Sequence, residues 1–446
     1  MMRREEMEQR QKMTETKWTR QPLRVSGRYF MEGDKPFFWL GDTAWLLFHR
    51  LNLEEAYQYL RNRKELGFNV IQAVLVNSVA GDPVMDNEVK DASQPEYWDF
   101  CDQVIRMAEE MGLYLPLLPA WGSLVKKKIL TEDNAERFAH FLGKRYQNAP
   151  NLIWILGGDV RGSDGLEVFR KEARILKQYN PERLIGFHPF GRTSSAQWFA
   201  KEDWLDFHMF QSGHRRYDQA QLGVWDDNLA KEEFFGEDNW RYVERDYARD
   251  EKPVLDGEPS YEGIPQGLHN PRNGFWEEAD ARRYAYWSVF AGAAGHTYGN
   301  NAVIQFYDGK SGTGAYGVRE TWQEALHYPG GGQMQYLKGL MESVDFAAGR
   351  PGDALLLFGQ KERYHRIAVF AGEDFILCYD YMGDEFLLDL TKYMDQILDI
   401  WWMNPQSGAC SYAGAVKGEA RWQASPLRRK GDSNDWVLVM RRRADG

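Results

Sequence analysis

The chain has 446 residues, of which 43% are hydrophobic and 27% are charged, and its formal net charge is −11 at pH 7. This composition can fill a large core, which excludes a disordered protein and suits one large barrel with a small additional domain. The negative charge argues against nucleic acid or an anionic membrane surface as the main partner. Three widely spaced cysteines offer no disulfide framework and no Cys-x-x-Cys motif, and they leave a single Cys378–Cys410 bridge open.

Residues 1–20 are polar and charged. They lack the apolar core and the small-residue cleavage site of a secretory signal, and no apolar run in the chain is long enough to span a bilayer. We therefore expect a polar N-terminal arm at 1–20, a cytoplasmic location and no membrane partner. A homo-oligomer remains one option for the assembly.

Residues 21–347 alternate between apolar runs and helical patterns. A predicted hairpin at 21–36 comes first, and eight apolar runs follow at 37–40, 70–76, 113–119, 152–156, 184–188, 207–211, 253–256 and 295–298. Helical patterns occupy 52–66, 98–111, 134–146, 166–179, a charged stretch that ends near 249, 279–291 and 321–344, and Gly67 and Gly112 mark two helix ends. Eight such units predict an α/β protein, a (β/α)8 TIM barrel, rather than an open doubly wound sheet.

The pattern changes over residues 348–446. Short β-like runs separated by turn residues lie at 354–358, 367–370, 375–379, 400–403 and 436–440. Such spacing predicts a small antiparallel β-sandwich that follows the barrel.

Two of the predicted barrel strands lead into carboxylates. The fourth run leads into Gly157-Gly158-Asp159, and the seventh leads into Gly257-Glu258-Pro259. The ends of strands four and seven lie on opposite sides of a barrel's mouth, where two carboxyl groups can flank a glycosidic bond. We therefore predict that Asp159 and Glu258 form a catalytic pair. For either residue alone, the alternative is a cap on the helix that follows its strand.

Two neighbouring acids are rivals of Glu258 for the nucleophile. Asp256 lies two residues earlier, so strand alternation puts it on the same face, and we expect it one layer deeper, paired with a buried arginine or histidine. Glu262 lies after the strand and is expected to orient another group.

Other residues near the strand ends are candidates for binding a sugar. Asp42, followed by Trp45, either grips sugar hydroxyls or caps a helix. Trp121 either stacks on a sugar ring or covers the core, and the histidines either contact substrate or are hydrogen-bonded core groups. The predicted substrate-binding residues are Asp42, Trp45, Asn77, Trp121, His188, His208, Gln211, His214, His296, Tyr298 and Asn300.

Motifs for other chemistries are missing from the sequence. There is no His-Glu-x-x-His, no Gly-x-Ser-x-Gly, no Walker-type loop, and no Gly-x-Gly-x-x-Gly after the first strand, and the nine histidines are scattered. We therefore predict an enzyme without a metal or another cofactor.

Several segments resemble blocks of the apiosidase-like glycoside hydrolases, a family of (β/α)8 enzymes. The first is Phe-Phe-Trp-Leu-Gly-Asp-Thr-Ala-Trp at 37–45, and others lie at 66–72, 153–159, 256–262 and 327–330. Residues 398–408 are similar to a small C-terminal β-domain, labelled collagen-binding, that often accompanies this barrel. The resemblance covers nearly the whole chain after residue 20 and rests on the combination of blocks.

The resemblance implies a glycosidase with Asp159 as acid/base and Glu258 as nucleophile. We expect it to cleave a small plant-derived oligosaccharide or glycoside, with retention of configuration. The larger related clan usually has glutamate after asparagine where this chain has Asp159 after Gly158, so the spacing of the pair must decide between retention and inversion. The alternative from another class is a non-catalytic carbohydrate-binding protein on a barrel scaffold, against which the two intact carboxylates argue.

Overall fold

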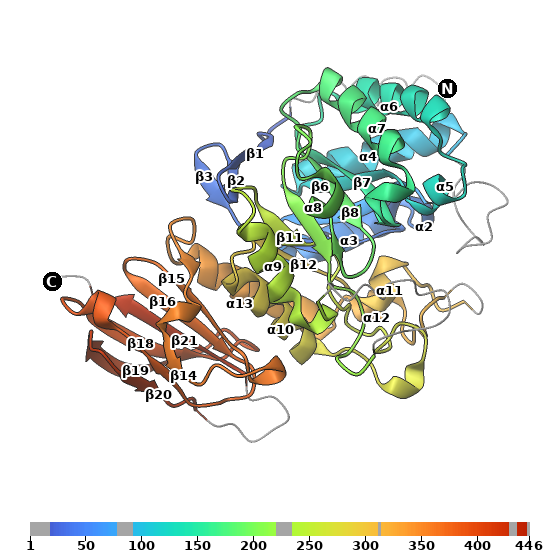
Figure 1. The fold of residues 1–446 in the computed structure, drawn as a ribbon. Coiled ribbons are helices and arrows are strands. Elements are labelled where there is room, and N and C mark those ends of the chain that lie inside the picture. The colour runs from blue at the N-terminus through green and yellow to red at the C-terminus, as the bar shows by residue number, and fades with distance from the viewer. Residues whose placement is uncertain (1–17, 78–91, 220–233, 311–313, 428–434, 444–446) are drawn as a thin grey trace.

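The computed structural model describes residues 18–77, 92–219, 234–310, 314–427 and 435–443 (Figure 1). The predicted polar arm at 1–20 therefore lies almost wholly outside the described residues. An antiparallel sheet precedes the barrel and contains β1 (Leu23–Ser26), β2 (Tyr29–Glu32) and β3 (Lys35–Phe37). It confirms the hairpin predicted at 21–36.

Eight strands in the described residues form the barrel. They are β4 (Trp39–Thr43), β5 (Val70–Val76), β6 (Leu115–Ala120), β7 (Leu152–Val160), β8 (Ile185–Pro189), β10 (His208–Gln211), β11 (Val254–Asp256) and β12 (Gly295–Tyr298). One sheet has the order β12-β4-β5-β6-β7-β8, and a second pairs β11 with β10, which also pairs with β9 (Thr193–Ser194). Backbone hydrogen bonds from Asp206 to Ile185 (2.9 Å) and from Ala294 to Val254 (3.0 Å) connect the two sheets. The predicted (β/α)8 barrel is confirmed.

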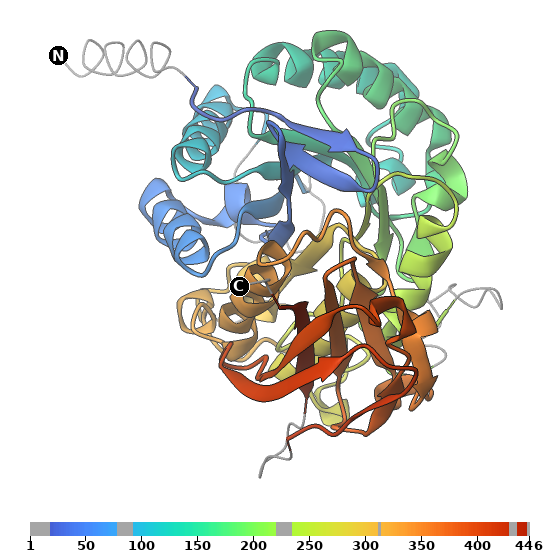
Figure 2. The same cartoon turned by 90° about the vertical axis from the view of Figure 1, so that its left-hand side faces the viewer.

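Helices surround these strands, as Figure 2 shows from another side. They are α2 (Leu47–Arg50), α3 (Leu53–Glu65), α4 (Pro95–Glu110), α5 (Ser123–Lys126), α6 (Glu132–Tyr146), α7 (Leu166–Tyr179), α8 (Ala196–Phe199), α9 (Asn239–Tyr247), α10 (Glu278–Phe290), α11 (Asn301–Ile304), α12 (Trp322–Ala325) and α13 (Pro329–Glu342). Gly67 and Gly112, at φ +85° and +76°, end α3 and α4 as predicted. The helix predicted at 321–344 is two helices, because Pro329 begins a new one. No helix of the described chain is long and apolar enough to cross a membrane.

The C-terminal domain is antiparallel, as predicted. Its sheets have the orders β13-β15-β16-β21-β18-β19 and β14-β17-β20. The strands are β13 (Arg350–Pro351), β14 (Leu356–Phe358), β15 (Ile367–Ala371), β16 (Phe375–Asp380), β17 (Phe386–Leu388), β18 (Ile397–Met403), β19 (Cys410–Lys417), β20 (Trp422–Ala424) and β21 (Trp436–Arg442). The sequence missed β19 because most of its side chains are exposed, so it lacks an apolar alternation. Cys378 and Cys410 are both free thiols, so the bridge between them is not formed.

The two domains meet along α10 (Figure 1). Every residue of this helix from Ala281 to Phe290 is buried, as expected for a helix covered on all sides. The rings of Tyr286 and Tyr379 stack with their centroids 4.5 Å apart, and a buried ion pair joins Arg282 Nε to Asp435 Oδ2 at 2.7 Å. These contacts fix the C-terminal sheets against the barrel.

Candidate active site

A distorted strand end presents Asp159 to the mouth of the barrel. The register of β7 against β8 shifts between Gly157 and Val160, and Gly157, Gly158 and Asp159 have φ values of +87°, +103° and +51°. A Cβ atom on Gly158 would lie 2.7 Å from the ring of Trp121, so only glycine fits there. A non-glycine residue at positive φ is uncommon, and here the bulge redirects the carboxyl group of Asp159.

Two histidines hold Glu258, which follows β11. His214 Nε2 donates a hydrogen bond to Glu258 Oε1 at 2.9 Å, and His188 Nε2 lies 3.3 Å from Oε2. The backbone N–H of Tyr261 points at His214 Nδ1 at 3.4 Å, which leaves the ring proton on Nε2, facing Glu258. Pro259 cannot donate a ladder hydrogen bond, consistent with the early end of this short strand.

Asp159 and Glu258 face each other. Carboxylate oxygens of the two residues and a ring nitrogen of His188 all lie within 4.8 Å of one another. Burial, followed by the charge of Glu258, raises the pKa of Asp159 above its ordinary value. Burial opposes ionisation of Glu258 as well, but the adjacent imidazoles of His188 and His214 lower its pKa. The two environments therefore favour a protonated Asp159 and an ionised Glu258 at the same pH.

This pair lies in a pocket at the C-terminal ends of the strands. Seven of the residues predicted from the sequence line it: Trp45, Asn77, Trp121, Asp159, Gln211, His214 and Glu258. His188 lies at its edge, where its ring packs against Trp45 (5.3 Å between centroids) and Trp121 (6.1 Å). The two indoles meet edge to face at 5.2 Å and form an aromatic wall beside the carboxylates. Such a wall suits the apolar face of a sugar ring.

Asp42 lies outside the pocket. It is fully buried, and its Oδ2 accepts hydrogen bonds of 2.6 Å from Tyr59 and from Arg63 Nε. The sequence offered a sugar subsite or a helix cap, and the structure gives neither: the residue preceding α2 is Leu46, and Asp42 forms a buried ion pair with Arg63 of α3.

We expect Asp42→Asn to destabilise the protein without acting on catalysis directly. Removing one partner of a buried ion pair leaves the other charge uncompensated, so the free energy of unfolding in denaturant should fall by about 3–5 kcal/mol. The control is Asp34→Asn, because Asp34 and its partner Arg24 are exposed, so removing this pair should leave the free energy of unfolding nearly unchanged. Unchanged stability with a raised KM would instead make Asp42 a substrate contact.

Three further predicted substrate-binding residues lie away from the pocket lining. His208 begins β10, and its Nε2 contacts Asp250 at 2.9 Å, at the opposite end of the strand from Gln211. His296 is buried in β12, where burial lowers its pKa to about 3. Asn300 caps α11, accepting a hydrogen bond of 2.9 Å from a backbone N–H. None of these three residues lines the pocket.

The two rival acids, Asp256 and Glu262, also have structural partners. Asp256 accepts hydrogen bonds from Ser212 Oγ (2.6 Å) and Asn239 Nδ2 (3.3 Å), so the expected arginine or histidine partner is wrong. Glu262 accepts a hydrogen bond from Tyr298. Tyr298, which was also predicted to bind substrate, does not line the pocket. Neither acid lines the pocket, which leaves Glu258 as the acid of this segment that faces it.

Comparison with known proteins decides the family. Residues 25–348 match the family model described as "Apiosidase-like, catalytic domain". The chain belongs to the apiosidase-like glycoside hydrolases. Residues 351–441 match the model described as "Putative collagen-binding domain of a collagenase".

Solved structures agree with this assignment. One described as a glycoside hydrolase is 39% identical, with a TM-score of 0.88, over 96% of this chain and 98% of its own. A glycoside hydrolase family 5 protein from Bacteroides vulgatus ATCC 8482 is 38% identical, with a TM-score of 0.86, over 94% of this chain and 93% of its own. No curated protein matches. The chain is thus a glycosidase acting on a carbohydrate, and the non-catalytic alternative is set aside.

Several residues of this glycosidase's pocket had not been singled out in the sequence. Tyr261 is buried beside Glu258, and burial together with that charge raises its pKa far above the usual range. Phe190, Arg192, Arg215 and Tyr316 also line the pocket. The first three lie in loops after strands and Tyr316 lies in the loop between α11 and α12, where no periodic pattern marks a residue. Tyr261 alone had a signal, since it falls within the family-like block at 256–262.

Asp159, His188 and Glu258 also form a set of side chains close enough to hold a metal ion. A metal would need the lone pair of the His188 nitrogen. Burial lowers the pKa of His188, but Glu258 and Asp159 outweigh it and raise the pKa above the ordinary value, so this nitrogen tends to carry a proton. The hydrogen-bonded arrangement suits an acid pair better than a metal centre.

We therefore expect activity to survive metal removal. Cleavage rates measured after dialysis against EDTA, and again after adding Zn²⁺ or Mg²⁺, should agree within about twofold, because no proposed step uses a metal ion. A large loss with EDTA that a metal restores would contradict the acid-pair assignment.

Proposed function

We propose that this glycosidase cleaves the O-glycosidic bond of a small plant-derived glycan with retention of configuration, using Asp159 as acid/base and Glu258 as nucleophile. The observation that carries the proposal is that one oxygen of each carboxylate lies within 4.8 Å of an oxygen of the other. Retaining glycosidases hold their carboxyl groups about 5–5.5 Å apart, whereas inverting enzymes leave about 6.5–9.5 Å for a water molecule. The short separation favours direct attack by Glu258.

The displaced pKa values support this division of roles. In the first step, the protonated Asp159 donates its proton to the glycosidic oxygen while Glu258 attacks the anomeric carbon. The bond to the leaving group breaks, and a glycosyl ester forms on Glu258. In the second step, the ionised Asp159 takes a proton from a water molecule, whose oxygen attacks the anomeric carbon and releases Glu258.

The pocket supports a compact sugar as the substrate. Trp45, Trp121 and Phe190 supply aromatic surface, while Asn77 and Gln211 supply hydrogen-bonding groups near the carboxylates. The family description, "Apiosidase-like", makes apiose one candidate for the sugar at the cleaved position. The loops around the pocket set which sugar fits, so related pentosides and hexosides belong in the same screen.

Hydrolysis of a glycoside panel tests this proposal. Aryl glycosides of apiose, arabinose, xylose, galactose, glucose and mannose would be incubated with the full chain, and proton NMR would follow the first anomer released. We expect cleavage of at least one glycoside, with a product of the same anomeric configuration as the substrate. An inverted first product would contradict the nucleophilic role of Glu258, and sugar binding without any cleavage would contradict catalysis.

A further inference from the structure

A hydroxyl group of the C-terminal domain reaches into the barrel. Tyr364 lies in the 3-10 turn Arg363–His365, and its hydroxyl donates to Glu237 at 2.9 Å from Oε2 and 3.1 Å from Oε1. Glu237 belongs to the barrel, in the 3-10 turn Gly236–Asp238 that precedes α9, and it is fully buried. A fully buried carboxylate is costly unless its partners are in place, so this contact between domains is a constraint on the structure.

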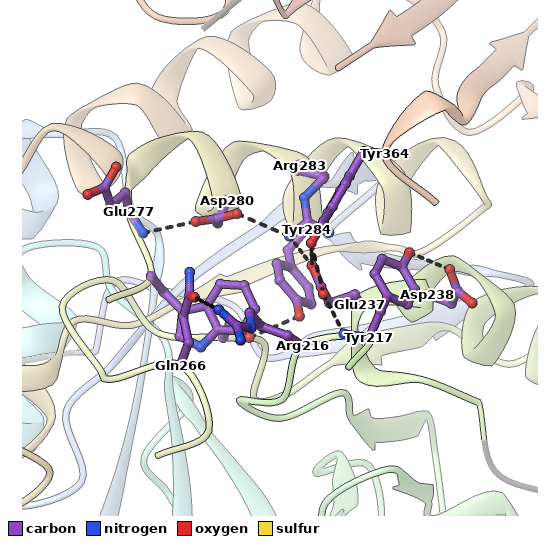
Figure 3. A network of polar contacts seen from close by, with 12 residues as sticks. Arg216, Tyr217, Glu237, Asp238, Gln266, Glu277, Asp280, Arg283, Tyr284 and Tyr364 are labelled. Carbon is purple, nitrogen blue, oxygen red and sulfur yellow. Dashed lines mark hydrogen bonds and ion pairs between the residues drawn. The ribbon is translucent and has the colours of Figure 1, made fainter. Parts of the chain in front are cut away.

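Glu237 has two more partners, both in the barrel. Its Oε2 pairs with Arg283 Nη2 of α10 at 2.8 Å, and its Oε1 accepts the backbone N–H of Tyr217 at 2.8 Å. Figure 3 shows Glu237 between Arg283 and Tyr364 on one side and Tyr217 on the other. The guanidinium of Arg283 also lies 5.0 Å from the ring of Tyr364 and 5.4 Å from that of Tyr381, both from the C-terminal domain. That domain therefore covers the ion pair and supplies one of its donors.

The Tyr217 amide ends a short segment that carries His214. His214 donates to Glu258, and its own carbonyl accepts the Gly267 N–H at 2.7 Å. Arg215, the next residue, lines the catalytic pocket. Only two residues separate His214 from Tyr217, so a shift of the Tyr217 amide changes the placement of the imidazole.

Helix α10 holds the other end of the same segment. Tyr284, next to Arg283, has its hydroxyl 2.9 Å from Ser260 Oγ, and Ser260 Oγ donates to the Gly213 carbonyl at 2.7 Å. Neighbouring residues of one helix thus fix the segment at both ends, through Ser260 at Gly213 and through Glu237 at Tyr217. Figure 3 shows Tyr284 and Arg283 extending from α10 toward this region.

We infer that Tyr364 and Glu237 are positioning residues, which hold the segment 213–217 so that His214 keeps its hydrogen bond to Glu258. The C-terminal domain thereby supports the active site of the barrel, although none of its described residues lines the pocket. The inference rests on the proposed function, because it assigns His214 the task of keeping the nucleophile Glu258 ionised. The groups that face Glu258 are His188, His214, Asp159 and Tyr261.

The test is Tyr364→Phe in the full chain, which removes one hydroxyl and keeps the ring. The matched control is Tyr393→Phe, because Tyr393 donates its hydroxyl to the Gly372 carbonyl at 2.8 Å within the C-terminal domain. We expect Tyr364→Phe to lower kcat about tenfold with a smaller change in KM, since displacement of a group near the reacting atoms costs rate. The acidic limb of the kcat/KM profile should move to higher pH, because a weakened His214 contact lets the pKa of Glu258 rise.

Hydrogen exchange provides a readout that does not depend on activity. In Tyr364→Phe, the backbone amides of 212–217 should exchange faster than in the wild type, while Tyr393→Phe should leave them unchanged. Wild-type rates, pH profile and exchange in Tyr364→Phe would overturn the inference, as would an equal loss in the two variants. Failure of the proposed function is distinguishable, because the wild type itself would then cleave no glycoside.

Discussion

Glu258→Gln is expected to lower kcat by about 10⁴-fold or more on every glycoside that the wild type cleaves. The amide keeps the size of the side chain but is a far weaker nucleophile than a carboxylate, so no glycosyl ester can form efficiently. Steady-state rates would be measured alongside the unfolding transition, because the variant also leaves His188 and His214 without an anionic partner. The loss should appear in kcat with the fold intact.

Two further variants make this result specific. Glu258→Ala leaves a space in which azide can attack, so added azide should restore cleavage and yield a glycosyl azide of inverted configuration. Glu262→Gln is the control, because Glu262 is a buried acid of the same segment that accepts from Tyr298 and does not line the pocket. It should retain kcat within about tenfold. Full turnover by Glu258→Gln, or azide rescue in an Asp159 variant alone, would contradict the assigned roles.

Asp159→Asn is expected to give losses that depend on the leaving group. Alkyl glycosides need a proton on the departing oxygen, so their kcat/KM should fall by about 10³–10⁴-fold, whereas dinitrophenyl glycosides need none and should change little. With the activated substrates, a burst of dinitrophenol should precede slow turnover, because the second step has lost its base.

The pH profile of the wild type belongs to the same prediction. Asp159 acts in its protonated form, and burial and the charge of Glu258 raise its pKa to about 6, so kcat/KM for alkyl glycosides should fall as the pH rises through that region. The profile should fall at low pH as well, below the lowered pKa of Glu258. Asp159→Asn should lack the basic limb. An equal loss on all leaving groups would contradict the acid/base role.

The strands, and the positions of Asp159 and Glu258 at strand ends, could be predicted from the sequence for a physical reason. Buried parallel strands are continuous apolar runs, and glycine or proline marks their ends, so counting runs put Asp159 after strand four and Glu258 after strand seven. The barrel then requires these ends to share one face. Prediction worked where a short local pattern and a closed architecture determine the position of a residue.

Prediction from the sequence failed where the role of a residue depends on a contact with a distant part of the chain. His188 and His208 both lie on barrel strands, but His188 contacts Glu258 at the mouth and His208 contacts Asp250 at the other end. The difference is a matter of position along the strand, which an apolar run does not reveal. Asp42 likewise depends on Arg63, which comes from another element.

Tyr364 shows the limit most clearly. It lies 127 residues from Glu237, in another domain and within an irregular turn, so no spacing or periodicity connects the two. The hydrogen bond between Tyr364 and Glu237 becomes apparent only in the folded structure, where α10 packs against both domains.

Trapping the covalent intermediate tests the central claim most directly. The full chain would be incubated with a 2-deoxy-2-fluoro analogue of a glycoside that it cleaves, and intact mass and peptide sequencing would locate the sugar. The account predicts one sugar per chain, attached to Glu258 in the peptide that contains Asp256 and Glu262. A label on Asp159, Asp256 or Glu262, or no label on an enzyme that the analogue inactivates, would contradict it.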